Sequence, residues 1–141
     1  MRNQNMDSVR VVGTAKASIA TATTTALDFG TPNDIDLRST DWARGCRLLL
    51  VLRLTTAGTA DTTDWTVQDA PDSSGSIGTP ATAVTSAVSG SLAGGTSDQT
   101  AVIAITPQSG RPWLRVNVHR ASGTTDTTVA SAILLAIPNS I

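Results

Sequence analysis

The sequence contains no glutamate and no tyrosine, and it has one lysine, one cysteine and one histidine. A single cysteine, Cys46, excludes an intrachain disulfide and therefore a fold held together by a disulfide framework. Glutamate and lysine favour exposed helices, whereas the 23 threonines of this chain favour strands. These absences predict an all-β protein before any single segment is considered.

Charge and hydropathy exclude further classes. A net charge of -1 excludes a chain that is basic overall, as nucleic-acid-binding domains often are, and leaves room only for a local arginine cluster. No segment approaches the roughly 20 apolar residues of a membrane helix, and residues 1–8 lack the apolar stretch of a signal peptide. We therefore expect residues 9–141 to form a single domain behind a flexible N-terminal arm, residues 1–8.

Side chains suited to catalysis or metal binding are sparse. Cys46 and His119 could form a nucleophile–base pair, but Cys46 borders the most apolar run and is interpreted as a small buried side chain. Structural zinc needs about four ligands, and neither a phosphate-binding loop nor a nucleophile elbow is present. The aspartates of residues 61–72 lie at turns and strand ends, where aspartate is common. We expect no enzyme activity and no cofactor.

The most apolar run, residues 47–54, alternates between two faces. One face is assigned to the core and consists of Leu48, Leu50, Leu52 and Leu54. The opposite face consists of Arg47, Leu49, Val51 and Arg53. Two arginines that bracket two aliphatic side chains are an unusual exterior, and they indicate a second packing surface.

Residues 110–119 show the same period of two. The apolar side chains on one face are Leu114, Val116 and Val118. The other face carries a large aromatic, a cation, an amide and the histidine: Trp113, Arg115, Asn117 and His119. We interpret this second face as a contact surface for another protein, against the alternatives of an ordinary packed tryptophan and a solvent-exposed histidine.

The remaining pattern completes a sandwich. The last strand, residues 127–137, is apolar on both faces, so we expect both faces to be covered. Further strands are predicted over residues 9–12, 15–27, 35–37, 64–69, 81–88 and 100–106. We expect one helical turn within residues 39–45 and loops over residues 70–78 and 89–97. About seven to nine strands with regular turns predict a single antiparallel β-sandwich or jelly roll.

Two turns are near copies of each other, at residues 58–63 and 123–128. Each has the form Gly-Thr-x-Asp-Thr-Thr, in which glycine and aspartate favour a tight turn. They could be equivalent corners of the sandwich, or recurrent turn chemistry in a threonine-rich chain. A calcium site at Asp61 and Asp126 would need several further oxygen ligands to converge, and no aspartate-rich calcium loop is present.

The order of these segments resembles a known class. The pattern is an apolar strand at 48–54, a Thr/Gly turn, Trp65-Thr-Val-Gln-Asp-Ala-Pro-Asp-Ser-Ser-Gly75, a Gly/Ser-rich middle, Gly110-Arg-Pro-Trp-Leu-Arg115 and a terminal strand at 129–138. Over about residues 45–138 it resembles the small tailed-phage virion proteins that decorate or cement capsids and have a β-sandwich or jelly-roll fold. This chain has Trp113 where that pattern would place a tyrosine.

The resemblance implies a structural protein on the outer surface of a virion capsid, made in the host cytoplasm and often trimeric. Such a protein binds the major capsid protein and bridges neighbouring subunits, without direct contact with nucleic acid or membrane. The alternative is a tail, head-fibre or host-adhesion module of the same sandwich type. The candidate contact residues are Trp113, Arg115, Asn117, His119, Arg47 and Arg53, together with Arg2 and Met6 of an arm that would become ordered on a neighbour.

Overall fold

The structure is a computed structural model that describes residues 9–20, 23–30, 34–39, 46–55, 62–79, 89–93, 98–106, 109–120 and 128–138. Within these ranges the chain forms eleven strands and one 3-10 helix, η1 (Leu37–Ser39). The strands are β1 (Arg10–Ile19), β2 (Thr24–Ala26), β3 (Ile35–Asp36), β4 (Cys46–Thr55), β5 (Thr62–Ala70), β6 (Asp72–Ser73), β7 (Ser76–Ile77), β8 (Ser89–Ala93), β9 (Gln99–Ile105), β10 (Trp113–Arg120) and β11 (Thr128–Pro138). The all-β prediction is confirmed.

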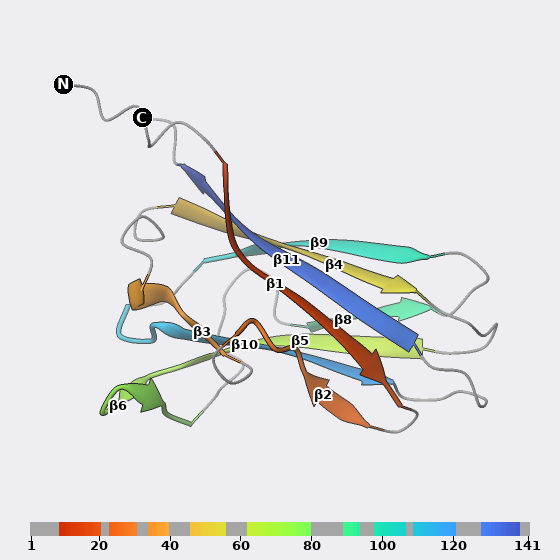
Figure 1. Ribbon diagram of the computed structural model, residues 1–141, viewed down its shortest axis with the longest axis horizontal. Coiled ribbons are helices and arrows are strands. Elements are labelled where there is room, and N and C mark those ends of the chain that lie inside the picture. Colours follow the sequence, from red (N-terminus) through yellow and green to blue (C-terminus); the bar gives the residue numbers. More distant parts are fainter. Residues whose placement is uncertain are drawn as a thin grey trace.

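Nine of these strands form two facing antiparallel sheets, and β6 and β7 pair only with each other (Figure 1). One sheet has the order β1-β11-β4-β9 and the other β2-β10-β5-β8, with β3 also pairing with β10. Along the chain, β1 and β4 belong to the first sheet, β5 and β8 to the second, and β9, β10 and β11 alternate between the two. This interleaving is the arrangement of a jelly roll, as the sequence predicts.

The core lies between the two sheets, and the alternation predicted for residues 47–54 sets it. Leu48, Leu50, Leu52 and Leu54 are fully buried. Three of their four neighbours on β11 are alanines, so large side chains on β4 lie beside small ones and the layers can interdigitate. From the second sheet, Leu114, Val116 and Val118 of β10 close the core, as predicted.

Strand β1 is longer than the sequence pattern suggests. Residues 9–12 and 15–27 are predicted as separate strands, but β1 runs unbroken from Arg10 to Ile19 and pairs with β11 throughout. Its register shifts between Val11 and Gly13, which marks a β-bulge. A side chain at Gly13 would come within 3.2 Å of the Phe29 ring, so the glycine gives this ring room against the sheet. The split prediction is therefore wrong.

Two predicted loops contain strands. Residues 70–78 hold the hairpin β6–β7, whose two-residue turn places Ser74 at φ 54° and Gly75 at φ 87°. Residues 89–97 were expected to be a loop because of their Gly/Ser content, but residues 89–93 form β8, which pairs with β5. Ladder hydrogen bonds with a formed strand outweigh weak intrinsic propensity here.

Some predictions fall outside the described residues: the arm over residues 1–8, the strand over 81–88, most of the helical turn at 39–45, and the turns with Asp61 and Asp126. In the part of the chain that the structure describes, no helix is long and apolar enough to cross a membrane.

A pair of truncations tests the assignment of the β4 faces. Leu50 is fully buried between Leu134 and Ile103, whereas Val51, next to it in sequence, points outward. We expect Leu50→Ala to lower the free energy of unfolding by about 2–5 kcal/mol, because it leaves a cavity in the core. Val51→Ala should cost less than about 1 kcal/mol. Urea unfolding of both variants measures this, and equal losses would contradict the assignment.

Candidate contact surface

The contact face predicted on β10 is largely engaged by the protein's own side chains. Trp113 is only 7% exposed, although it lies on the face opposite Leu114. Asn117 donates from Nδ2 to Oε1 of Gln68 on β5 at 2.8 Å. His119 Nδ1 lies 3.9 Å from the Asp64 carboxylate, also on β5. Asn117 and His119 therefore have partners on the neighbouring strand.

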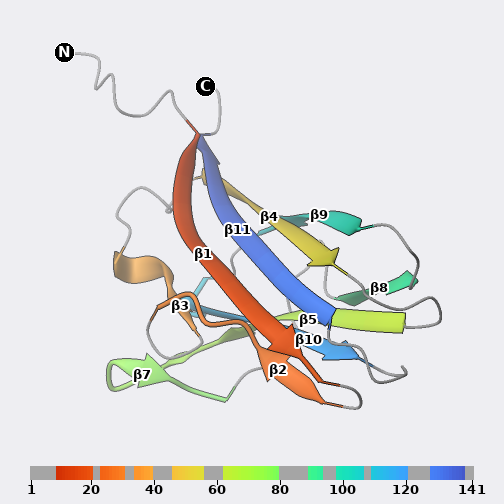
Figure 2. The ribbon, with the colours of Figure 1, turned by 45° about the vertical axis from the view of Figure 1, so that its right-hand side comes forward.

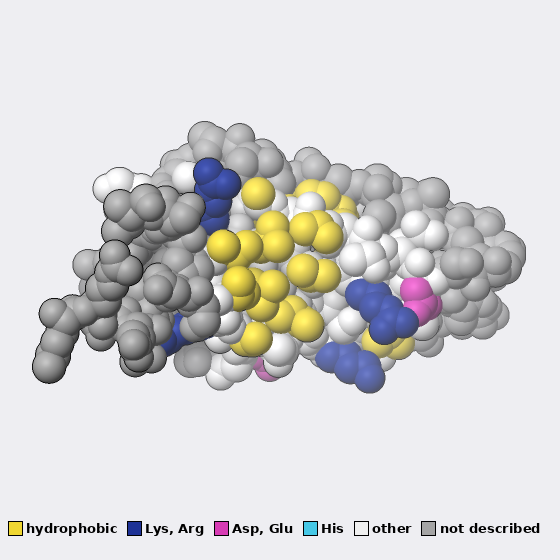
Figure 3. All heavy atoms as spheres, turned by 90° about the horizontal axis from the view of Figure 1, so that it is seen from above, with side chains coloured by type: hydrophobic (Ala, Val, Ile, Leu, Met, Phe, Trp, Pro, Cys, Tyr) yellow, Lys and Arg dark blue, Asp and Glu magenta, His cyan; other side chains and the backbone are white. Residues whose placement is uncertain are grey.

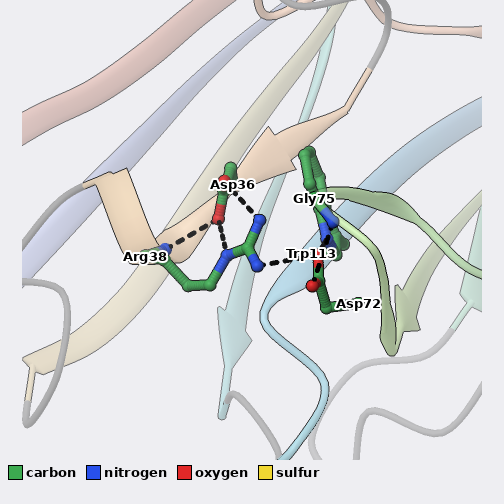
Figure 4. A network of polar contacts seen from close by, with 5 residues as sticks. All are labelled: Asp36, Arg38, Asp72, Gly75 and Trp113. Carbon is green, nitrogen blue, oxygen red and sulfur yellow. Dashed lines mark hydrogen bonds and ion pairs between the residues drawn. The ribbon is translucent and has the colours of Figure 1, made fainter.

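Trp113 belongs to a polar clamp, defined as Asp36, Arg38, Asp72 and Trp113 (Figure 4). The Arg38 guanidinium donates two 2.9 Å hydrogen bonds to Asp36, and its Nη1 lies 2.7 Å from Asp72 Oδ1. The Trp113 indole N–H donates to the same Asp72 oxygen at 3.0 Å, and Arg38 Cζ lies 5.2 Å from the ring centroid. The clamp joins β3, η1 and the β6–β7 hairpin to the start of β10.

The hydrogen bonds of the clamp stabilise its ionised carboxylates. The Trp113 indole, with smaller contributions from the Gly75 backbone N–H and Arg38, holds the pKa of Asp72 below its ordinary value against partial desolvation. The side-chain hydrogen bonds of Arg38 likewise lower the pKa of Asp36. The partner carboxylate Asp36 in turn raises the pKa of Arg38. Asp36, Arg38 and Asp72 are therefore charged at neutral pH, and the neutral Trp113 indole contributes a hydrogen-bond donor.

Two further arginines hold buried carboxylates. Arg115 donates to both oxygens of Asp34 at 2.7 and 3.0 Å, and Asp34 is 6% exposed. This contact raises the pKa of Arg115. Arg111 donates from Nε to the fully buried Asp69 at 2.5 Å and from Nη2 to the Asp69 carbonyl at 3.0 Å. The planar fork of Arg115 matches the two carboxylate oxygens of Asp34, whereas that of Arg111 spans one carboxylate oxygen and the backbone carbonyl of Asp69.

These contacts give Trp113 and Arg115 a structural role within the protein. Both are anchors of the fold, because each ties β10 to a segment distant in sequence. A role for them, or for Asn117 and His119, in contact with another molecule stays a prediction. Arg2 and Met6 lie outside the described residues.

The outward side of the β1-β11-β4-β9 sheet is different, because it is apolar and exposed. We name it the outer apolar face and define it by seven side chains that the strand registers bring together: Val11, Leu49, Val51, Val102, Ala104, Ile133 and Leu135. Val102 is 63% exposed, Val11 58% and Ile133 42%. Figure 2 shows β1 and β11 side by side across this side of the sandwich, and Figure 3 shows the continuous apolar field.

The face is built row by row. Val11, Leu135, Leu49 and Ala104 are cross-strand neighbours in one row. The next row is Thr14, Ile133, Val51 and Val102. Leu49, Val51 and Leu135 on the central strands are half-buried, whereas Ile133 and the flanking Val11, Val102 and Ala104 are exposed. The described residues do not cover the outer side of β11, contrary to the expectation for residues 127–137.

Charged side chains border the outer apolar face at both ends. Arg47 is exposed beyond the first row, where it pairs in register with Ile137. Lys16 and Arg53 are exposed beyond the second row, in the same register row as Ser131. Arg53 forms an ion pair with Asp98. Of the candidate residues, Arg47 and Arg53 therefore lie at the rim of an exposed apolar surface.

The sequence pointed to only part of this surface. Residues 47–54 and the double-sided strand at 127–137 indicated it, but the contributions of Val11 and Val102 were missed. A signal was present at Val102, which lies on the face opposite Ile103 and Ile105 in an otherwise core-forming strand. Val11 carried none, because the β-bulge shifts the alternation after it.

Comparisons with known proteins show a likeness among solved structures. No family model and no curated protein matches the chain. Among solved structures, the chain is similar to a chain of the cyanophage Pam1 capsid asymmetric unit, with 18% sequence identity and a TM-score of 0.40 over 92% of this chain and 85% of that chain. A likeness of this size carries no argument about function. Among the described residues, no group of three or more His, Cys or acidic side chains could hold a metal ion.

The clamp predicts how the stability of the protein depends on pH. Folding lowers the pKa of Asp72, so its ionised carboxylate contributes to the stability of the fold above the unfolded-state pKa of about 4. This contribution is lost as the pH falls through the lower pKa of the folded state. We expect wild type to be more stable than Asp72→Asn at pH 6, and the gap to close below about pH 4. Urea unfolding across pH 3–6 measures it, with the exposed Asp28→Asn as control. A gap independent of pH would contradict the clamp.

Proposed function

We propose that this protein is a structural virion component that decorates or cements a capsid. It binds the outer capsid surface and bridges neighbouring major capsid protein subunits. The observation that carries the proposal is the outer apolar face: one sheet of the jelly roll is apolar on both sides, and only its inner side is used for the core.

An exposed apolar field of this kind supports a contact function. The most extensive contiguous apolar patch on the surface of a soluble protein is often a binding site. Here the field combines an apolar centre with a charged rim, which is the usual anatomy of a protein–protein interface. Because it lies on four paired strands, it is a rigid surface that needs little ordering on binding.

Two observations support a capsid as the binding partner. One is the order of segments over residues 45–138, and the other is the jelly-roll arrangement, which is common among viral capsid domains. Lectin domains share the same architecture, so the fold alone does not decide the function. The charged groups described above support a structural role, since Asp34 and Asp69 are buried against arginines. We include in the proposal that the protein is not an enzyme.

A homo-oligomer, with a trimer as the expected form, belongs to the same proposal. Several linked copies would present several faces to a shell whose subunits repeat regularly, and simultaneous contacts raise the overall affinity well above that of one contact. Such an arrangement would let one protein bridge neighbouring subunits on the outside of a pressurised shell.

Addition of the purified protein to capsids assembled without it tests the proposal. We expect saturable co-sedimentation with capsids of the virus that encodes it, and a higher temperature of DNA release from filled particles, because a bound protein stabilises the state it binds. Capsids saturated beforehand with the protein are the control for non-specific association. Binding to tails or host cells with none to capsids would contradict the proposal and favour the adhesion alternative.

A further inference from the structure

We infer that the outer apolar face docks a partner surface with an apolar centre and a rim of carboxylates, and that it does not pair with a second copy of this chain. The inference rests on the proposed function, within which the partner is the capsid shell. It assigns a contact chemistry to that shell and separates this contact from the one that makes a homo-oligomer.

The first argument is the sign of the rim. Among the described side chains at the edges of the face, three are cations, Lys16, Arg47 and Arg53, and one is a carboxylate, Asp98. Asp98 is paired with Arg53, so each end of the face keeps an excess of positive charge. Figure 3 shows cationic side chains on two sides of the apolar field. A carboxylate rim on the partner complements both ends.

The second argument concerns a second copy. In a two-fold dimer through this face the axis lies in the plane of contact, and each copy uses the same patch. An axis along the strands places the Arg47 end against the Arg47 end. An axis across the strands places Arg47 against the end that carries Lys16 and Arg53. Both arrangements bring like charges together, which opposes association.

The third argument is size. Four strands about 4.8 Å apart, with rows of outward side chains about 6.7 Å apart, give the two apolar rows an area on the order of 250 Å². The whole sheet face, over the 11 residues of β11, is on the order of 700 Å². The area of the whole sheet face matches one side of a standard interface between two different proteins, about 800 Å². Obligate homodimers bury larger and more apolar surfaces.

Three variants of the full chain test the inference on capsids assembled without the protein. Lys16→Gln combined with Arg47→Gln removes two rim cations. Thr24→Asp combined with Ser76→Asp changes the net charge equally, at exposed positions of β2 and β7 away from the face. Val102→Thr combined with Ile133→Thr makes the apolar centre polar and keeps β-branched side chains suited to strands.

We expect the rim variant to lower capsid affinity about tenfold at low salt and to reduce its dependence on salt, because rim charges act through screened attraction. The apolar variant should lower affinity by a similar factor, mainly through faster dissociation. The matched charge control should bind like wild type. Melting temperatures of all three should stay close to wild type, since the changed side chains are exposed or at the surface.

Sedimentation of the free protein supplies the second readout. If the face joined two copies, neutralising Lys16 and Arg47 would strengthen self-association, whereas a carboxylate-rimmed partner predicts no gain. Stronger self-association of the rim variant, or wild-type capsid binding by both face variants, would overturn the inference and leave the proposed function standing. Absence of capsid binding by wild type would overturn the proposed function, and the inference with it.

Discussion

The packing of the β4 leucines between the two sheets is the interaction on which the rest of this structure depends. Leu48, Leu50, Leu52 and Leu54 are fully buried, and the alanines opposite them on β11 leave the space they fill. Because side chains alternate along a strand, a core on one side of β4 forces Arg47, Leu49, Val51 and Arg53 outward. The exposed apolar field and its cationic rim are thus a direct geometric consequence of where the core lies.

The second sheet differs from the first in its polar contacts. Its outward side carries polar and charged groups that hold peripheral segments in place: Arg115 binds Asp34, and the clamp binds η1 and the β6–β7 hairpin. Arg111 binds the buried Asp69, which lies in register with Leu114 on the core-facing side of the same sheet. A chain with no glutamate and one lysine makes these contacts with arginine and aspartate, and the pairs Arg115–Asp34 and Arg38–Asp36 are bidentate. The two sheets therefore differ in their outward sides: that of β2-β10-β5-β8 is engaged by polar contacts within the protein, and that of β1-β11-β4-β9 is an exposed apolar surface.

Strand alternation predicted most of this fold, and its failures have physical causes. The faces of residues 47–54 and 113–119 followed from the period of two alone, because a half-buried strand alternates buried and outward side chains. The sequence pattern did not reveal the close approach of Gly13 to the Phe29 ring or the strand β8, since that approach and the pairing of β8 with β5 both come from tertiary structure. The partners of Trp113 and Arg115 are 41 and 81 residues away in sequence, a separation that no local pattern encodes.

A cryo-electron microscopy reconstruction of intact particles of the virus that encodes this chain would test the central claim most directly. The account predicts the jelly roll on the outside of the shell, with the β1-β11-β4-β9 sheet against the capsid protein and carboxylates of that protein near Lys16 and Arg47. A reconstruction in which this sheet faces solvent, or packs against the same sheet of a second copy, would contradict it.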